Sequence, residues 1–176
     1  AKIFPTTAFG YRRITVERPL KLAFKPHDAE QLASLQADKG WDKLEAELQQ
    51  AILKALPALP ERILCRELFK KQLTKALGTT KLPAPAFKLL VITFGEQSDE
   101  AQVCTTKGEV EASSDLRDYE NVPLGEDIND YLKREVLPHV PDAWIDLGKT
   151  DPLDGQVGIV GYEIPFNRHF YQYQPP

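Results

Sequence analysis

Helical and strand-like patterns occupy separate blocks of this chain instead of alternating along it. Apolar residues recur at the three-to-four spacing of buried helix faces across about 28–77, and again across about 125–137. Residues 11–24, 101–112 and 156–164 instead show the alternation or the turn residues typical of short strands and hairpins. Since a parallel α/β sheet needs strict strand–helix alternation, the blocks predict an α+β fold in which helices pack with short, mostly antiparallel strands.

Proline and glycine set the expected boundaries of these elements. Pro19 interrupts the first strand pattern and predicts an edge strand or a bend. An amphipathic helix over 61–77 is expected to end at the glycine that follows it, and a hairpin is expected to turn near residues 107–108. The apolar run 86–94 fits either a buried strand or a helix. We favour a helix, because prolines suited to a first turn precede the run and a glycine follows it.

Charge is divided unevenly along the chain. Residues 1–95 carry 16 Lys and Arg against 9 Asp and Glu, whereas residues 96–176 carry 6 against 17, which gives net charges of +7 and −11. Such a split predicts either two halves that attract each other or a basic face that contacts a polyanion. A chance distribution of charges over solvated faces explains the split equally well, so both interpretations stay open.

The sequence also bears on the cellular compartment and on whether the chain is part of a longer protein. No apolar run approaches the roughly 18 residues that a membrane span needs, and the two cysteines, Cys65 and Cys104, form no C-x-x-C pair. We therefore expect a cytoplasmic protein with no membrane partner. The chain begins with Ala1 and contains no methionine, which indicates either a removed initiator or a piece of a longer protein, and we favour the second.

A search for catalytic motifs finds none. The chain has no G-x-G-x-x-G dinucleotide fingerprint, no phosphate-binding P-loop and no G-x-S-x-G nucleophile elbow. His27, His139 and His169 are far apart in the sequence, and none has a second ligand type at helical spacing. We predict no catalytic, cofactor-binding or metal-ligating residue in this chain.

Two clusters of side chains nevertheless suit binding. Five cations recur along the predicted helix over 61–77: Arg62, Arg66, Lys70, Lys71 and Lys75. Such a row contacts phosphates without reading sequence, although an ordinary solvated helix face has the same pattern. Five aromatic residues lie within twelve positions near the end of the chain: Tyr162, Phe166, Phe170, Tyr171 and Tyr173. Beside Arg168 these rings could stack on bases, anchor an interface or simply close a core.

Three segments resemble one known family. They are FGYRRITVERPLKL at 9–22, DLRDYENVPLGEDINDYLKREVLPHVPDAWID at 115–146 and VGYEIPFNRHFYQYQPP at 160–176. All three are similar to the C-terminal part of the modification (M) subunit of type I restriction-modification DNA methyltransferases, and they occur in the family's order. Residues 81–104 resemble the same family more loosely. The segment 151–160, DPLDGQVGIV, departs from the family and looks like an insertion or a variant loop.

The resemblance implies a parent subunit that transfers a methyl group from S-adenosylmethionine to the N6 atom of adenine in duplex DNA. That subunit would act with a specificity subunit and a restriction subunit, and the target base would have to leave the stack. The family's glycine-containing cofactor loop and its Asn-Pro-Pro-Phe/Tyr motif are both absent from this chain. We therefore expect residues 1–26 to form a strand and link to a missing methylase core, residues 27–176 to form a C-terminal α+β domain, and the chain alone to be inactive.

The resemblance also suggests which residues would serve as contacts. The candidates for the DNA backbone are Arg12, Arg13, Arg62, Arg66, Lys70 and Lys71. The candidates for a partner subunit or a nucleic-acid surface are Arg168, Phe170 and Tyr171.

Two alternatives remain open from the sequence. One is a stand-alone interaction or regulatory protein that resembles the M-subunit surface and has no enzymatic activity. The other is a small enzyme of another kind, which would need a pocket of perturbed titratable groups that the sequence does not indicate. An upstream reading frame that contains the Asn-Pro-Pro-Phe/Tyr motif would distinguish the M-subunit fragment from the regulatory protein.

Overall fold

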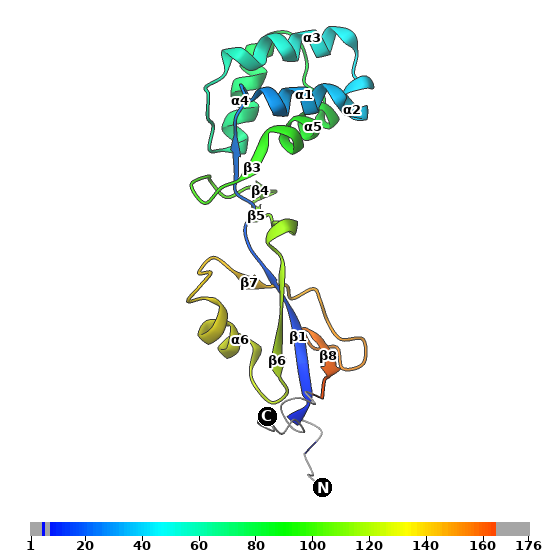
Figure 1. The fold of residues 1–176 in the computed structure, drawn as a ribbon, viewed down its shortest axis with the longest axis vertical. Coiled ribbons are helices and arrows are strands. Elements are labelled where there is room, and N and C mark those ends of the chain that lie inside the picture. Colours follow the sequence, from blue (N-terminus) through cyan, green and yellow to red (C-terminus); the bar gives the residue numbers. More distant parts are fainter. Residues whose placement is uncertain (1–4, 6–7, 165–176) are drawn as a thin grey trace, which may run out of the picture. The chain divides into compact units, whose positions relative to one another are not determined.

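The computed structural model describes Pro5 and residues 8–164. The chain divides into two compact units. The first, which we call the sheet unit, combines Ala1–Pro19 with Ala112–Pro176, and the second, the helical unit, is Leu20–Glu111. The α+β class is confirmed, because helices and short antiparallel strands occur in both units (Figure 1).

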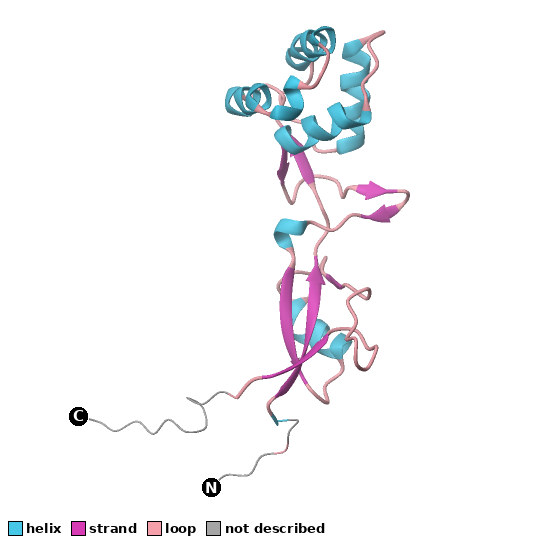
Figure 2. Cartoon of the chain, turned by 90° about the vertical axis from the view of Figure 1, so that its right-hand side faces the viewer, coloured by secondary structure: helices cyan, strands magenta, loops and turns pink. Residues whose placement is uncertain are grey.

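The helical unit contains six helical elements and two short strand pairs. Its helices are α1 (Ala29–Ala37), α2 (Lys39–Asp42), α3 (Ala46–Ala55), the 3-10 turn η2 (Leu56–Ala58), α4 (Arg66–Leu77) and α5 (Ala84–Phe94). The strand pairs are β2 (Leu22–Phe24) with β3 (Gly95–Gln97), and β4 (Thr105–Thr106) with β5 (Glu109–Val110). Figure 2 shows the β4–β5 hairpin extending away from the helices of this unit.

Local sequence explains most of these boundaries. Asp28 begins α1 by accepting the backbone N–H groups of Glu30 and Gln31, which would otherwise lack partners at the helix start. Gly78, with a φ of 62°, follows the last residue of α4. The helix predicted over 86–94 is confirmed as α5, and the hairpin turns at residues 107–108, both with positive φ.

The helix predicted over 61–77 is wrong in its first turn, because α4 begins only at Arg66. Ile63 exchanges two backbone hydrogen bonds with Phe24, at 2.8 and 2.9 Å. The chain at Ile63 is therefore extended and forms an antiparallel bridge to β2. The ring of Phe24 in turn stacks on Phe69 of α4, with centroids 4.4 Å apart. Both rings are fully buried, and they form the centre of the helical unit's core.

The sheet unit is built around one long strand, β1 (Gly10–Glu17). Its other elements are η3 (Ser114–Leu116), β6 (Asp118–Pro123), α6 (Ile128–Tyr131), the π-helix η4 (Leu132–Val136), β7 (Trp144–Ile145) and β8 (Ile159–Tyr162). β1 pairs antiparallel with β6 along one edge and with β7 and β8 along the other (Figure 1). The chain between 115 and 123, which the sequence pattern did not assign to a strand, thus contains the partner of β1.

One face of this sheet is covered by helix. Ile14 and Val16 of β1 and Val122 of β6 pack with Leu132 and Val136 of η4, and Figure 2 shows α6 behind the paired strands β1 and β6. The helix predicted over 125–137 is therefore present in Ile128–Val136 as α6 and η4. Its apolar stripe is what holds it against the sheet.

The boundaries between the two units lie at 19/20 and 111/112. A boundary between residues 26 and 27 would fall inside the helical unit, whereas the chain passes between units at 19/20 and again at 111/112. The physical reason is that all the strand partners of β1 come from the C-terminal part of the chain. Whether residues 1–26 also join a methylase core stays a prediction.

The net charges of the two units differ from those of the two sequence halves. The helical unit contains 13 basic and 13 acidic residues, and the sheet unit contains 9 and 13, so their net charges are 0 and −4. The basic first half of the sequence therefore does not form a basic unit, since its side chains are shared between two folded bodies. No helix in the part of the chain that the structure describes is long and apolar enough to cross a membrane.

Candidate interaction surface

The predicted cations of the helical unit have different surroundings. Arg66 is tied to the hairpin: its guanidinium donates to both carboxylate oxygens of Glu111, at 2.5 and 2.9 Å, and to the carbonyl oxygen of Thr105 at 2.8 Å. These bonds lower the pKa of the Glu111 carboxyl below its ordinary value. A guanidinium satisfied in this way has few donors left for a phosphate, so Arg66 acts as a clamp between α4 and β5.

The other three predicted contact cations of this unit, and Lys75 of the same row, remain at the surface. Arg62 pairs with Glu100 at 2.7 Å, and both side chains are largely exposed. The Lys70 ammonium lies 5.4 Å from the ring centre of Phe87, and Lys71 points outward from α4. Lys70, Lys71 and Lys75 are thus the cations of this helix best placed for an anionic partner.

The two predicted arginines of the sheet unit lie on opposite faces of β1. Arg12 forms an ion pair with Asp154 at 2.6 Å and donates to the carbonyl oxygen of Gly158 at 3.1 Å. Arg13 is exposed, and its guanidinium lies 4.7 Å from the ring centre of Tyr119. Alternate residues of a strand point to opposite faces, so only Arg13 is presented on the face away from α6.

This face, which we call the outer face, carries side chains from three neighbouring strands. Its exposed or half-buried members include Tyr11 and Arg13 of β1, Tyr119 and Asn121 of β6, and Ile159 of β8. The register places Arg13 between Asn121 and Ile159 in one row, and Tyr11 beside Gly161 in the next. A Cβ at Gly161 would come within 2.6 Å of the Tyr11 ring, so only glycine lets this ring lie over β8.

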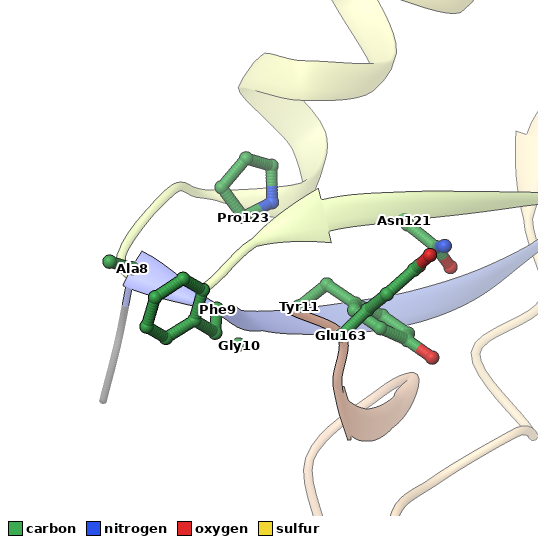
Figure 3. A pocket seen from close by; sticks show the side chains of 7 residues that line it. All are labelled: Ala8, Phe9, Gly10, Tyr11, Asn121, Pro123 and Glu163. Carbon is green, nitrogen blue, oxygen red and sulfur yellow. The ribbon is translucent and has the colours of Figure 1, made fainter. Parts of the chain in front are cut away.

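An open hollow of about 410 Å³ adjoins the outer face at the start of β1. Figure 3 shows the side chains around it, from the two residues before β1, from β1 and β6, and from the residue after β8: Ala8, Phe9, Gly10, Tyr11, Asn121, Pro123 and Glu163. Two aromatic rings form an apolar wall, and one amide and one carboxylate supply the polar groups. This combination can stack on a planar group or hydrogen-bond a donor, and Glu163 is the one carboxylate in its lining.

Perturbed titratable groups occur away from this hollow. Burial raises the pKa of the Cys104 thiol, and burial together with the hydrogen bond to Glu120 raises the pKa of the Tyr131 hydroxyl. The Tyr131 hydroxyl donates to the Glu120 carboxylate at 3.1 Å, but neither Tyr131 nor Cys104 lines the hollow. Among the described residues, no group of three His, Cys, Asp or Glu side chains is arranged to hold a metal ion.

Three of the predicted contact residues, Arg168, Phe170 and Tyr171, lie outside the described residues. Tyr11, Tyr119 and the hollow were not predicted from the sequence. The alternation of residues 10–17 already carried a signal for Tyr11, because it shares the parity of Arg13. No such signal existed for Tyr119, since DYENVP has too few apolar residues to indicate a strand.

Comparison with known proteins gives no assignment: no known protein family, no curated protein and no solved structure matches the chain.

Proposed function

We propose that this chain is the C-terminal part of the M subunit of a type I restriction-modification DNA methyltransferase, and that it serves as a non-catalytic region for contacts with partner subunits. The parent subunit would use S-adenosylmethionine to methylate adenine N6 in the cytoplasm. This chain would supply neither the cofactor site nor the target-base site, because it lacks both family motifs.

The observation that carries the proposal is where the three family-like segments lie. Residues 9–22 contain β1, residues 115–146 contain β6, α6, η4 and β7, and residues 160–164 contain most of β8. Although about 90 positions separate the first segment from the second, residues 9–19, 115–146 and 160–164 all lie in the sheet unit, whereas the more loosely similar residues 81–104 lie in the helical unit. Similar segments that arise by chance would be spread over both units, whereas inheritance of one folded unit would place them together in that unit.

Charge favours protein over DNA as the main partner. Binding to a DNA backbone needs several unpaired cations on one surface. Here Arg12 and Arg66 are engaged by carboxylates, the helical unit has no net charge and the sheet unit is acidic. The outer face instead combines tyrosine, arginine and an exposed isoleucine, a composition typical of protein interfaces. Any DNA contact would depend on Arg13, Lys70 and Lys71.

The coding sequence upstream of Ala1 gives the first test. We expect an open frame that contains the Asn-Pro-Pro-Phe/Tyr motif and the glycine-containing cofactor loop. The full subunit, purified with its specificity subunit, should transfer labelled methyl groups from S-adenosylmethionine to adenine, whereas the 176-residue chain should transfer none.

A matched pair of variants in the full subunit tests the role in assembly. Tyr119→Ala removes the ring that Arg13 contacts on the outer face, and Lys54→Ala changes an exposed side chain on α3 in the other unit. We expect the first variant to weaken assembly with partner subunits and the second to leave it unchanged. An upstream frame without the two motifs would contradict the proposal and favour the stand-alone regulatory protein.

A further inference from the structure

Strand β6 forms one edge of the described sheet (Figure 1), and its pairing shows which of its backbone groups point away from β1. The N–H of Leu124 donates to the carbonyl oxygen of Gly10 at 3.1 Å, and antiparallel bonding alternates along a strand. Every second residue from 118 to 122 therefore directs its N–H and C=O groups toward β1. Tyr119 and Asn121, which lie between them, direct theirs toward the open edge.

The two ends of this edge are closed by the chain itself. The N–H of Tyr119 donates to the Asp118 carboxylate at 2.7 Å, and Pro123 has no N–H, while its carbonyl oxygen accepts the N–H of Glu126 at 3.1 Å. Within the part of the chain that the structure describes, the N–H and C=O of Asn121 and the C=O of Tyr119 have no hydrogen-bond partner. Both residues are exposed. Edge groups of this kind can pair with a strand from another chain.

The carboxylates beside this edge lack a counter-ion. Asp118 accepts the N–H of Tyr119, and Glu120 accepts the hydroxyl of Tyr131 at 3.1 Å, so both are bonded by neutral donors. Neither carboxylate forms an ion pair with a described cation. Arg13 lies on the opposite face of the sheet, over the Tyr119 ring.

The nearby arginines do not neutralise these two carboxylates. Arg117 precedes Asp118 in the chain, and Arg18 lines a crevice of about 240 Å³ together with Asp118 and Glu120. Each arginine already has a carboxylate partner, at 2.8 and 3.4 Å respectively: Glu17 and Asp142. The other titratable residues of the crevice are Glu135 and His139. The edge of β6 therefore keeps a negative charge that suits a basic partner.

We propose that the edge of β6 pairs with an extended basic segment of a partner subunit, which adds an antiparallel strand to the sheet. This inference deepens the proposed function and rests on it, since that function supplies the partner. The residue of the segment opposite Asn121 exchanges two backbone hydrogen bonds, and the residue opposite Tyr119 donates a third. Lysine or arginine lies opposite Glu120 and Asp118, and an apolar side chain lies beside the Tyr119 ring.

Other occupants fit this edge less well. The β6 edge of a second copy of the chain would bring two further unpaired carboxylates to the same surface, and like charges on neighbouring strands are unfavourable. The phosphates of a nucleic acid would be repelled by Asp118 and Glu120, and they offer no backbone groups to pair with Asn121. A basic strand satisfies both the free backbone groups and the charge.

Labelled peptides and the 176-residue chain test the pairing by fluorescence anisotropy. A peptide of alternating lysine and valine should bind, and one of alternating glutamate and valine should bind at least about 10-fold more weakly. In the bound register the valine amides face β6 and the lysine amides face away. Methylation of the valine amides should therefore abolish binding, whereas methylation of the lysine amides should leave the dissociation constant within about twofold.

Variants of the chain test which edge is used. Asn121→Pro removes the outward N–H but none of the bonds to β1, and it should raise the dissociation constant by about 10-fold or more. Asn121→Ala keeps the backbone and should bind within about twofold of the wild type. Asp118→Asn with Glu120→Gln should raise the dissociation constant by about 3- to 10-fold and reduce its dependence on salt. Its matched control is Glu47→Gln with Glu109→Gln, which removes the same charge from exposed positions of the helical unit and should change nothing.

The possible results separate this inference from the proposed function. The pairing is refuted if the lysine–valine peptide does not bind, or if neither valine-amide methylation nor Asn121→Pro weakens its binding. The proposed function is unaffected by these results, because the upstream frame and methyl transfer test it. In the full subunit, Asn121→Pro should weaken assembly with a partner subunit, and unchanged assembly would mean that the partner does not use this edge. Loss of a concentration-dependent self-association in Asn121→Pro would assign the edge to a second copy and overturn the inference.

Discussion

The clamp between Arg66 and Glu111 offers a direct test of how the helical unit is held together. Removing Arg66 leaves Glu111 partly buried without its counter-ion, and removing Glu111 leaves Arg66 only the more distant Glu67, at 3.8 Å. Arg66 is 15 % exposed and Glu111 is 28 % exposed, so the pair lies between a surface ion pair, worth about 0.2–1 kcal/mol, and a buried one, whose disruption costs about 3–5 kcal/mol. We expect Arg66→Met and Glu111→Gln each to lower the free energy of unfolding by about 2 kcal/mol.

The double variant measures the interaction itself. With both partners changed, the loss should be smaller than the sum of the two single losses, and the difference gives a coupling energy of about 1–2 kcal/mol. Urea unfolding followed by tryptophan fluorescence is suitable, because the chain has two tryptophans and each unit contains one, Trp41 and Trp144. In a Trp144→Phe background the signal reports only the helical unit.

The stabilisation that Glu111 contributes to the fold should change with pH in a defined direction. Hydrogen bonds from Arg66 hold the pKa of Glu111 below its ordinary value. The folded state therefore binds this proton less readily than the unfolded state, and the stabilisation is complete at neutral pH and lost as the pH falls through the folded-state pKa. The gap between wild type and Glu111→Gln should shrink between about pH 7 and about pH 3.

Two results would refute this reasoning. A coupling energy below about 0.3 kcal/mol, the ordinary error of additivity, would mean that the two side chains act independently. A gap between wild type and Glu111→Gln that stays constant with pH would mean that the Glu111 charge does not stabilise the fold.

Three further outcomes are expected. Phe69→Ala should cost about 3–5 kcal/mol, because it empties a fully buried ring position at the centre of the helical core, and calorimetry should register it as a lower melting temperature. Gly158→Ala should destabilise the sheet unit by about 2–3 kcal/mol and Gly155→Ala by only about 1 kcal/mol. Both glycines have positive φ, but only at Gly158 would a Cβ also clash with neighbouring atoms. Equal losses of stability would contradict this steric argument. If the chain binds duplex DNA, Lys70→Ala and Lys71→Ala should each reduce the slope of log affinity against log salt by about 1, and unchanged slopes would exclude them as phosphate contacts.

Local rules predicted the helical unit well. The helix at 84–94 followed from prolines before it and a glycine after it, and the turn at residues 107–108 followed from its glycine. Trp41, Leu48 and Ile52 are buried, in keeping with the apolar spacing across about 28–77. Each of these features depends on residues within a few positions of one another, and such information is present in a linear sequence.

Long-range pairing could not be predicted in the same way. Strand β6 has only one buried residue, Val122, because one face of the strand is solvated and it forms the edge of the described sheet. Its sequence therefore lacks the alternation that indicates a strand. The outer face was missed for this reason, since Tyr119 approaches Arg13 only when β6 pairs with β1.

The sequence by itself determined the fold class, most helix boundaries and the family resemblance on which the proposed function rests. Tertiary structure alone decided which distant segments share a unit, and thereby which charges share a surface. Arg12 and Arg66 looked like free cations in the sequence, but folding brings Asp154 and Glu111 to them from 142 and 45 positions away. Electrostatic interactions depend on distance in space, so the linear division of charge could not show that each unit would be neutral or acidic.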